Sequence, residues 1–203
     1  MTEIVVVRAK PNLVNREDQF LGGVASIGWP DTGDLAGADR SAIERTLKEH
    51  HPSNALSIRI SQIHKFVNLP VDSIILTPSY ETRDIHAFRT TSSYQYRREW
   101  VSEGNPHTIA VQHIKTLPRR AFPDRVQRAL LAAKKTVTDF SKYESLISSV
   151  LIDGPAPKEQ TGQHASAPDA EAEAVRTLRE LLSSKDEKVR LQAAIALVGR
   201  HAP

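Results

Sequence analysis

The spacing of apolar residues along residues 1–151 alternates between a period typical of strands and one typical of helices. Ala25, Ile27 and Trp29 alternate with small or polar residues until Pro30 and Gly33 interrupt the run, which is the pattern of a half-buried strand that ends at a turn. Comparable apolar runs predict strands over residues 4–9, 24–29, 73–78, 84–96, 108–117 and 136–140.

Helical spacing appears in the segments between these strands. Leu56, Ile60 and Ile63 recur on one helix face, and Pro70 lies just beyond the end of that pattern. Ser41, followed three residues later by Glu44, predicts a capping box in which each side chain bonds a free backbone donor of the first turn. Helices are predicted over residues 40–51, 55–67, 122–135 and 142–151.

This order of elements predicts the fold class and the domain boundaries. Hairpin-like strands with segregated helices favour an α+β domain over residues 1–151, built on a small mixed or antiparallel sheet or barrel with flanking helices. Residues 152–168 are rich in Pro, Gly, Ser and Ala, which predicts a flexible linker. Residues 169–203 predict a helical hairpin, since two apolar stripes flank the polar stretch "SSKDE".

The predicted C-terminal hairpin has a consequence for assembly. Its string "DEKVRLQAAIAL" resembles the second helix of a HEAT-type repeat. A single hairpin of this kind cannot bury its apolar stripe alone, so it must dock on its own domain, on a protein partner or on another copy. Because the linker separates it from its own domain, we expect a homo-oligomer formed through residues 169–203.

Composition limits the classes of protein that fit. The chain of 203 residues has no Cys, so neither disulfides nor thiolate chemistry are expected, and a cytoplasmic location follows as the simplest expectation. No signal peptide and no membrane-spanning run is predicted. The formal net charge is +3, and because basic and acidic residues balance from Lys158 onward, the excess belongs to residues 1–157. This mild basicity suits a nucleotide as well as a polymer.

Motifs for catalysis are missing from the sequence. It has no GxSxG, HExxH, GxGxxG or GxxxxGK[ST] pattern. His107 and His113 lie on or near one predicted strand without a placed carboxylate, so no metal site is expected. Asp31 and Asp34 could serve as acid and base, although Asp in a turn more often bonds its own backbone. We therefore expect no catalytic residue, no cofactor and no metal.

Basic doublets interleaved with aromatic residues point instead to nucleic acid. Arginines suit phosphates and aromatic faces suit unstacked bases. The alternative is a solvated rim of arginine with tyrosines filling the sheet. The basic doublets are Arg97-Arg98, Arg119-Arg120 and Lys134-Lys135, with Arg125 and Arg128 between the last two, and the aromatic residues among or beside them are Tyr94, Tyr96, Trp100 and Phe122.

The order of motifs resembles a known family over residues 3–147. The succession "IVVVRAKPN", "FLGGVASIGWPDTGDL", "HKF", "PVDSIILTP", "SSYQY", "AVQHIKTLPRRAF" and "ALLAAKKTV" is similar to the N-terminal domain of Mrr-like restriction endonucleases. That domain is regarded as PUA-like, akin to the EVE and YTH modules that hold a modified base in an aromatic pocket. The resemblance implies a sensor domain, and the residues after it are too few for the nuclease domain of those enzymes.

The resemblance also implies which residues hold the ligand. Residues at motif positions are Arg8, Gly28, Trp29, Phe66, Asp72, Tyr94, Tyr96 and Val111. The sequence departs from the family pattern at Val71, Phe88, Ser92, Ile109 and His113, the last standing where a second aromatic wall, a Trp, is expected. The implied ligand-binding set is Trp29, Tyr94, Tyr96, Arg8, His113 and Asp72, and the implied nucleic-acid backbone contacts are Arg97, Arg98, Arg119 and Arg120.

Two hypotheses follow. In the first, the chain is a non-catalytic reader of a modified base or nucleotide, in DNA, RNA or a nucleotide signal, serving phage defence or counter-defence and oligomerised through its tail. In the second, it is an assembly protein whose PUA-like domain is a scaffold and whose tail drives oligomerisation or recruits a partner. The reader hypothesis predicts that Trp29, Tyr94 and Tyr96 converge on one concavity edged by arginine.

Overall fold

The computed structural model describes residues 3–50 and 56–153. The chain divides into two units, residues 1–156 and 157–203, and every described residue belongs to the first. The predicted linker and helical hairpin therefore lie outside the described residues, apart from the end of α5, which runs through the predicted domain end to Asp153. In the described part of the chain no helix is long and apolar enough to cross a membrane.

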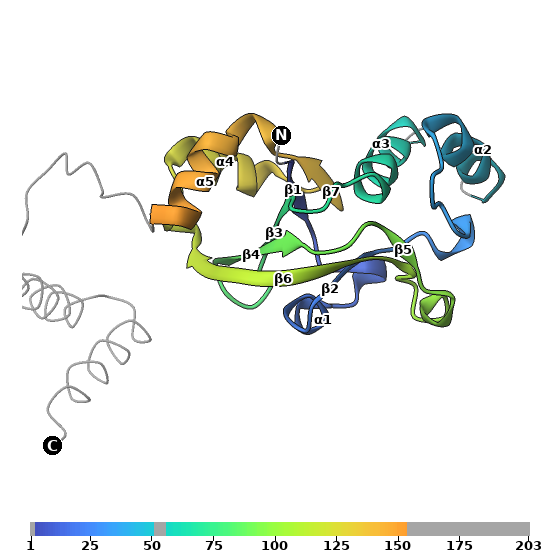
Figure 1. The fold of residues 1–203 in the computed structure, drawn as a ribbon, viewed down its shortest axis with the longest axis horizontal. Coiled ribbons are helices and arrows are strands. Elements are labelled where there is room, and N and C mark those ends of the chain that lie inside the picture. Colours follow the sequence, from blue (N-terminus) through green and yellow to red (C-terminus); the bar gives the residue numbers. More distant parts are fainter. Residues whose placement is uncertain (1–2, 51–55, 154–203) are drawn as a thin grey trace, which may run out of the picture. The chain divides into compact units, whose positions relative to one another are not determined.

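The described unit has a mixed α+β fold whose sheet curls into a half-barrel, which confirms the predicted α+β class (Figure 1). The strands are ordered β2-β6-β4-β3-β1-β7, and the short β5 pairs with β6 beside this path. Between described strands, β1 and β3 pair in parallel and the other pairs are antiparallel. The strands are β1 Ile4–Val7, β2 Val24–Ile27, β3 Ile74–Pro78, β4 Asp84–Thr90, β5 Gln95–Tyr96, β6 His107–Pro118 and β7 Val137–Asp139.

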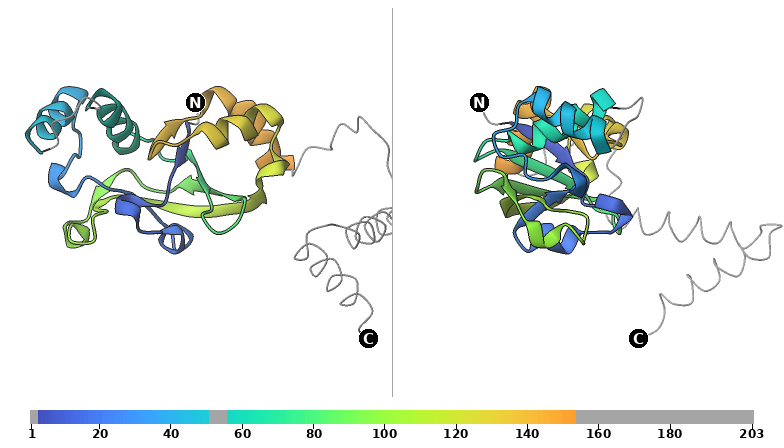
Figure 2. Two further views of the ribbon diagram at one scale, coloured as in Figure 1. Left: turned by 180° about the vertical axis from the view of Figure 1, so that it is seen from behind. Right: turned by 90° about the vertical axis from the view of Figure 1, so that its right-hand side faces the viewer.

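Helices flank the strands in two pairs. Figures 1 and 2 show α2 and α3 at one end of the domain and α4 and α5 at the other. The helices are α1 Glu17–Leu21, α2 Arg40–His50, α3 Leu56–Val67, α4 Asp124–Ala132 and α5 Glu144–Asp153. Single 3-10 turns are η1 Pro11–Leu13, η2 Pro30–Thr32, η3 Arg98–Trp100, η4 Arg119–Ala121 and η5 Ser141–Tyr143.

Each face of the sheet packs against its own core. Val5 and Val7 of β1 point into a core shared with α1, α2 and α3, whereas Ile4 and Val6 point into a second core shared with α4 and α5. Because side chains alternate across a strand, β1 is buried on both faces and contains no polar residue. This two-sided burial anchors β1, so that the residues after it are held in place at the end of the strand.

Several predicted boundaries are wrong, for identifiable reasons. The predicted strand over 84–96 is two strands, β4 and β5, because the Ala110 N–H of β6 donates to the Ser92 hydroxyl at 3.0 Å and not to a backbone carbonyl. The predicted capping box is also wrong. Asp39 caps α2, since its Oδ1 accepts the Ala42 N–H at 2.7 Å, while Glu44 pairs with Lys48 instead. Helix α1 was not predicted, because five residues are too few for a periodic signal.

Candidate functional site

A cavity of about 450 Å³ lies where the ends of β1 and β2 approach α3. The loop after β1, the turn after β2, the first half of α3 and the residue before β7 all contribute to its wall. The lining residues are Lys10, Pro11, Asn12, Gly28, Trp29, Pro30, Asp31, Arg59 and Thr136. Lys10, Asn12 and Asp31 are exposed, so the cavity is open to solvent. Its volume lies within the range of about 300–1,000 Å³ typical of small-molecule sites.

The sheet brings Lys10 and Thr136 together. β7 pairs with β1 in antiparallel register, and the Arg8 N–H donates to the Thr136 carbonyl at 2.9 Å. The residues that follow β1 and precede β7 are therefore neighbours at one sheet edge, although they are far apart in sequence.

Close packing of three loops fixes one part of the cavity wall. The Asn12 Nδ2 donates to the Gly104 carbonyl at 3.1 Å. Gly104 adopts a φ of 78°, and a Cβ at this position would collide with the Asn12 side chain. Gly28 lies against the same pair, because a Cβ there would contact the Gly104 carbonyl at 3.5 Å. The β5–β6 loop thus holds Asn12 and Gly28 in the wall of the cavity.

Trp29 holds an unusual backbone conformation at the end of β2. Its φ of 67° and ψ of 52° place it in the left-handed region, which costs a non-glycine residue about 1–2 kcal/mol. Its side chain is partly buried, packs against the core and lines the cavity. A strained backbone conformation of this kind persists only where neighbouring contacts enforce it, and residues in such conformations are common at functional sites.

The enforcing contacts converge on the Trp29 carbonyl. Thr32 Oγ1 donates to it at 2.8 Å, and the Nε2 atom of the buried His107 lies 3.0 Å away. A carbonyl can only accept, so Nε2 carries the proton. The other ring nitrogen, Nδ1, then accepts from the Tyr94 hydroxyl at 2.8 Å, and that hydroxyl accepts the Leu35 N–H at 3.2 Å.

Burial keeps the two ionisable groups of this hydrogen-bond chain, His107 and Tyr94, uncharged. Desolvation lowers the pKa of His107 below its ordinary value, so the imidazole is neutral near pH 7. Desolvation also raises the pKa of Tyr94, so its hydroxyl stays protonated and able to donate. The hydrogen bonds therefore have one consistent direction, from Tyr94 through His107 to the backbone of Trp29.

Tyr94 and Tyr96 are not among the residues that line the Trp29 cavity. Their rings pack on His107 instead, Tyr94 stacked at a centroid distance of 5.8 Å and Tyr96 tilted at 5.4 Å. Of the three aromatic residues expected to converge on one concavity, only Trp29 lines the cavity. Tyr94 and Tyr96 pack on His107, which lies against the Trp29 carbonyl.

Arg8 lies next to the cavity and contacts Tyr80, the same ring that the cavity residue Lys10 contacts. Its Nε donates to the Tyr80 hydroxyl at 3.1 Å, and its guanidinium lies over the Tyr80 ring. Lys10 Nζ lies 4.9 Å from the centroid of the same ring. Tyr80 therefore holds the Lys10 ammonium in place by a cation–π contact.

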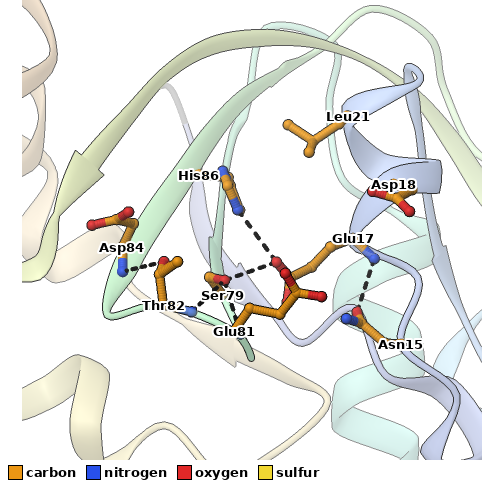
Figure 3. Close-up of a pocket in the computed structure, with 9 residues that line it drawn as sticks. All are labelled: Asn15, Glu17, Asp18, Leu21, Ser79, Glu81, Thr82, Asp84 and His86. Carbon is orange, nitrogen blue, oxygen red and sulfur yellow. Dashed lines mark hydrogen bonds and ion pairs between the residues drawn. The ribbon is translucent and has the colours of Figure 1, made fainter.

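A second depression, of about 340 Å³, lies beside α1 and the turn between β3 and β4 (Figure 3). Its central group is the buried carboxylate of Glu17, which accepts from the Ser79 hydroxyl at 2.9 Å and from the Tyr80 N–H, and lies 3.5 Å from His86 Nε2. These bonds tie α1 to the β3–β4 turn. The Glu17 carboxylate is thus occupied by internal partners, which favours a structural role.

The remaining predicted site residues lie apart from the Trp29 cavity. Asp72 is exposed in the turn before β3, with a φ of 68° and Arg89 3.9 Å away. His113 is exposed on β6 and shares the Thr116 hydroxyl with His86 at 2.9 Å each. Desolvation lowers the pKa of His113, and His86 adds to the effect.

The predicted backbone-contacting arginines fall at opposite ends of β6. Arg97 and Arg98 precede it, in the loop that carries Gly104, and the Arg97 guanidinium lies 4.5 Å from the Trp100 ring centroid. Arg119 and Arg120 follow it in η4. A strand of this length spans about 40 Å, so only Arg97 and Arg98 lie in the loop that packs against the cavity residues Asn12 and Gly28.

Sequence reasoning missed Lys10, Asn12, Arg59 and Thr136 as cavity residues. Asn12 carried a usable signal, since Asn after Pro tolerates left-handed backbone and its φ is 50°. Among the described residues, no group of three His, Cys, Asp or Glu side chains could hold a metal ion. The sequence matches no known family model, no curated protein and no solved structure.

Proposed function

We propose that this domain is a non-catalytic module that binds a nucleotide, or a modified base within a nucleic acid, in the Trp29 cavity. The observation that carries the proposal is a tryptophan held in a strained conformation as one wall of a cavity that also contains Lys10 and Arg59. The indole offers a flat face for a base, and the cations offer partners for a phosphate.

The polar wall residues add the means to distinguish ligands. The Gly104 carbonyl can only accept, so it orients the Asn12 amide with its nitrogen toward Gly104, and the Asn12 oxygen is left to accept from a ligand. Gly28 has no side chain, so its backbone forms this part of the cavity wall. The curled half-barrel with flanking helices supports the PUA-like interpretation, under which the module serves phage defence or counter-defence.

Calorimetric titration tests this proposal. Full-length protein is titrated with unmodified and base-methylated nucleoside monophosphates at several salt concentrations. Binding at about 150 mM salt that differs between bases supports the proposal. Attraction to phosphate alone would be equal for all bases and would weaken with salt, and that result would contradict it.

The packing of Tyr94 and Tyr96 on His107 favours a second candidate, in which the domain is a scaffold and residues 169–203 drive oligomerisation or recruit a protein partner. Both cores lie within residues 4–150, so we expect a chain lacking residues 155–203 to fold. Light scattering then separates the candidates: assembly through the tail predicts an oligomer that becomes a monomer on truncation. An unchanged mass would contradict this role for the tail.

A further inference from the structure

The loop between β1 and α1 presents an apolar side chain to solvent in a strained conformation. Asn12 and Leu13 are consecutive non-glycine residues with positive φ, 50° and 66°. Leu13 is 84% exposed and Val14 is 47% exposed, so neither is needed to fill a core. A leucine has no local reason to prefer left-handed backbone, and strained exposed positions of this kind gather at binding sites.

Hydrogen bonds fix this loop from both sides. Asn12 bonds the Gly104 carbonyl, and Arg16 makes an ion pair with Glu103 at 3.0 Å while also donating to the Glu103 carbonyl. The Val14 N–H closes the turn onto the Pro11 carbonyl at 3.0 Å. With its neighbours anchored, Leu13 is held outward as a rigid projection.

The loop that carries Leu13 connects the Trp29 cavity with a loop that carries two arginines. Pro11 and Asn12, the residues immediately before it, line the Trp29 cavity. The loop to which Asn12 and Arg16 are bonded carries Arg97 and Arg98, and Arg97 lies over the Trp100 ring. Leu13 thus follows two cavity residues in the chain, and its loop is bonded to the loop that carries two arginines. This combination suits a strand with stacked bases and phosphates, whereas an apolar protein partner would benefit little from the arginines.

We propose that Leu13 inserts between adjacent bases of a nucleic-acid strand, so that the neighbouring base enters the Trp29 cavity and its flanking phosphates reach Arg97 and Arg98. The inference rests on the proposed function and specifies its ligand as a base within a strand. Apolar wedges unstack base steps in this way, and the binding of the displaced base in its pocket offsets the cost of unstacking.

The test compares Leu13→Asn with Leu131→Asn. Asparagine tolerates the left-handed backbone of residue 13 but removes the apolar wedge. Leu131 is also an exposed leucine, 58% exposed, but lies on α4 and outside the cavity. The probes are AMP and a single-stranded DNA 12-mer that contains one 2-aminopurine, whose emission rises when it is unstacked. Equal melting temperatures for both variants and the wild type verify folding.

We expect Leu13→Asn to weaken binding of the 12-mer about tenfold, the size of one lost stacking contact, and to abolish the rise in emission. Its affinity for AMP should stay unchanged, and Leu131→Asn should match the wild type with both probes. A Leu13→Asn variant that binds the 12-mer like the wild type would overturn the inference, as would wild type that binds AMP but not the 12-mer, which would point to a protein contact at Leu13. Wild type that binds neither probe, and none of the unmodified or base-methylated monophosphates in the calorimetric titration, would contradict the proposed function itself.

Discussion

The Nε2 atom of His107 lies 3.0 Å from the carbonyl oxygen of Trp29, across 78 residues of sequence. Through this contact, strand β6 holds the backbone at the end of β2 in the left-handed region. The Trp29 side chain is thereby turned toward the cavity while its backbone belongs to the buried hydrogen-bond chain that begins at Tyr94. That hydrogen-bond chain therefore keeps Trp29 in place as a pre-formed wall of the cavity.

Replacing His107 by Ala should therefore destabilise the domain more than replacing an exposed histidine. The change leaves the partly buried Tyr94 hydroxyl without its acceptor and opens a cavity in place of the buried imidazole, for a combined loss of about 3 kcal/mol in the free energy of unfolding. His113→Ala, at an exposed position of the same strand, should cost less than about 0.5 kcal/mol. Urea unfolding monitored by circular dichroism measures both, and equal losses would contradict the role given to His107.

Stability should also fall on acidification through His107. Its pKa is lowered in the folded state, so below the unfolded value of 6.5 the unfolded chain binds a proton that the folded chain does not. The free energy of unfolding is therefore unaffected by this group above pH 6.5. It falls by up to about 1.4 kcal/mol per pH unit as the pH drops from 6.5 toward the pKa of His107 in the folded state.

Comparing urea unfolding at pH 7.5 and 5.5 isolates this contribution. His107→Gln keeps a donor near the Trp29 carbonyl but cannot titrate, so the acid loss should be smaller in this variant than in the wild type. Identical pH profiles for the two proteins would mean that His107 does not titrate differently on folding.

The contact between Asn12 and Gly104 predicts an unequal effect of two glycine substitutions. Gly104→Ala meets both a φ of 78° and a collision with Asn12, whereas Gly37→Ala meets a φ of 66° with nothing within 4 Å. The backbone term alone costs about 1 kcal/mol, so Gly37→Ala should lose about that much and Gly104→Ala clearly more. Thermal unfolding of the two variants measures the difference. Equal melting temperatures would contradict the prediction, because they would show that the Asn12 side chain moves aside at no cost in stability.

The positions that the sequence predicts well are those governed by local pattern. The alternation of Ala25 and Ile27 identified β2 because both side chains enter one core. Trp29 was identified because a tryptophan before Pro30 ends that alternation. Helix α3 followed from the spacing of Ile60 and Ile63, which are likewise buried.

Features that depend on distant contacts escaped prediction. Tyr94 was expected in a ligand pocket, but its hydroxyl is used by His107, a partner that only the β5–β6 pairing brings near. Arg59 resembles any helix-surface cation, and it joins Lys10 at one cavity only because the curled sheet brings the ends of β1 and β2 toward α3. Single polar residues of this kind carry no periodic signal.

Arg59 should recognise phosphate rather than base. Arg59→Gln removes a charge from the cavity wall, and a charge-assisted bond is worth about 1.5–3 kcal/mol, so affinity for a nucleoside monophosphate should fall at least tenfold. Affinity for the corresponding nucleoside should change little. Arg128→Gln, at an exposed position on α4, serves as the control for loss of charge. An equal loss of affinity for nucleoside and nucleotide would show that Arg59 does not contact the phosphate.

The most direct test of the central claim uses Trp29 itself as the reporter. The chain contains only Trp29 and Trp100, so Trp100→Phe leaves one indole, at the cavity, and Trp29→Phe leaves one outside it. A base stacked on Trp29 predicts saturable quenching by a nucleoside monophosphate in Trp100→Phe and none in Trp29→Phe. Equal response of the two variants, or no saturable response in Trp100→Phe with any base, would contradict the account that Trp29 is the wall of a nucleotide site.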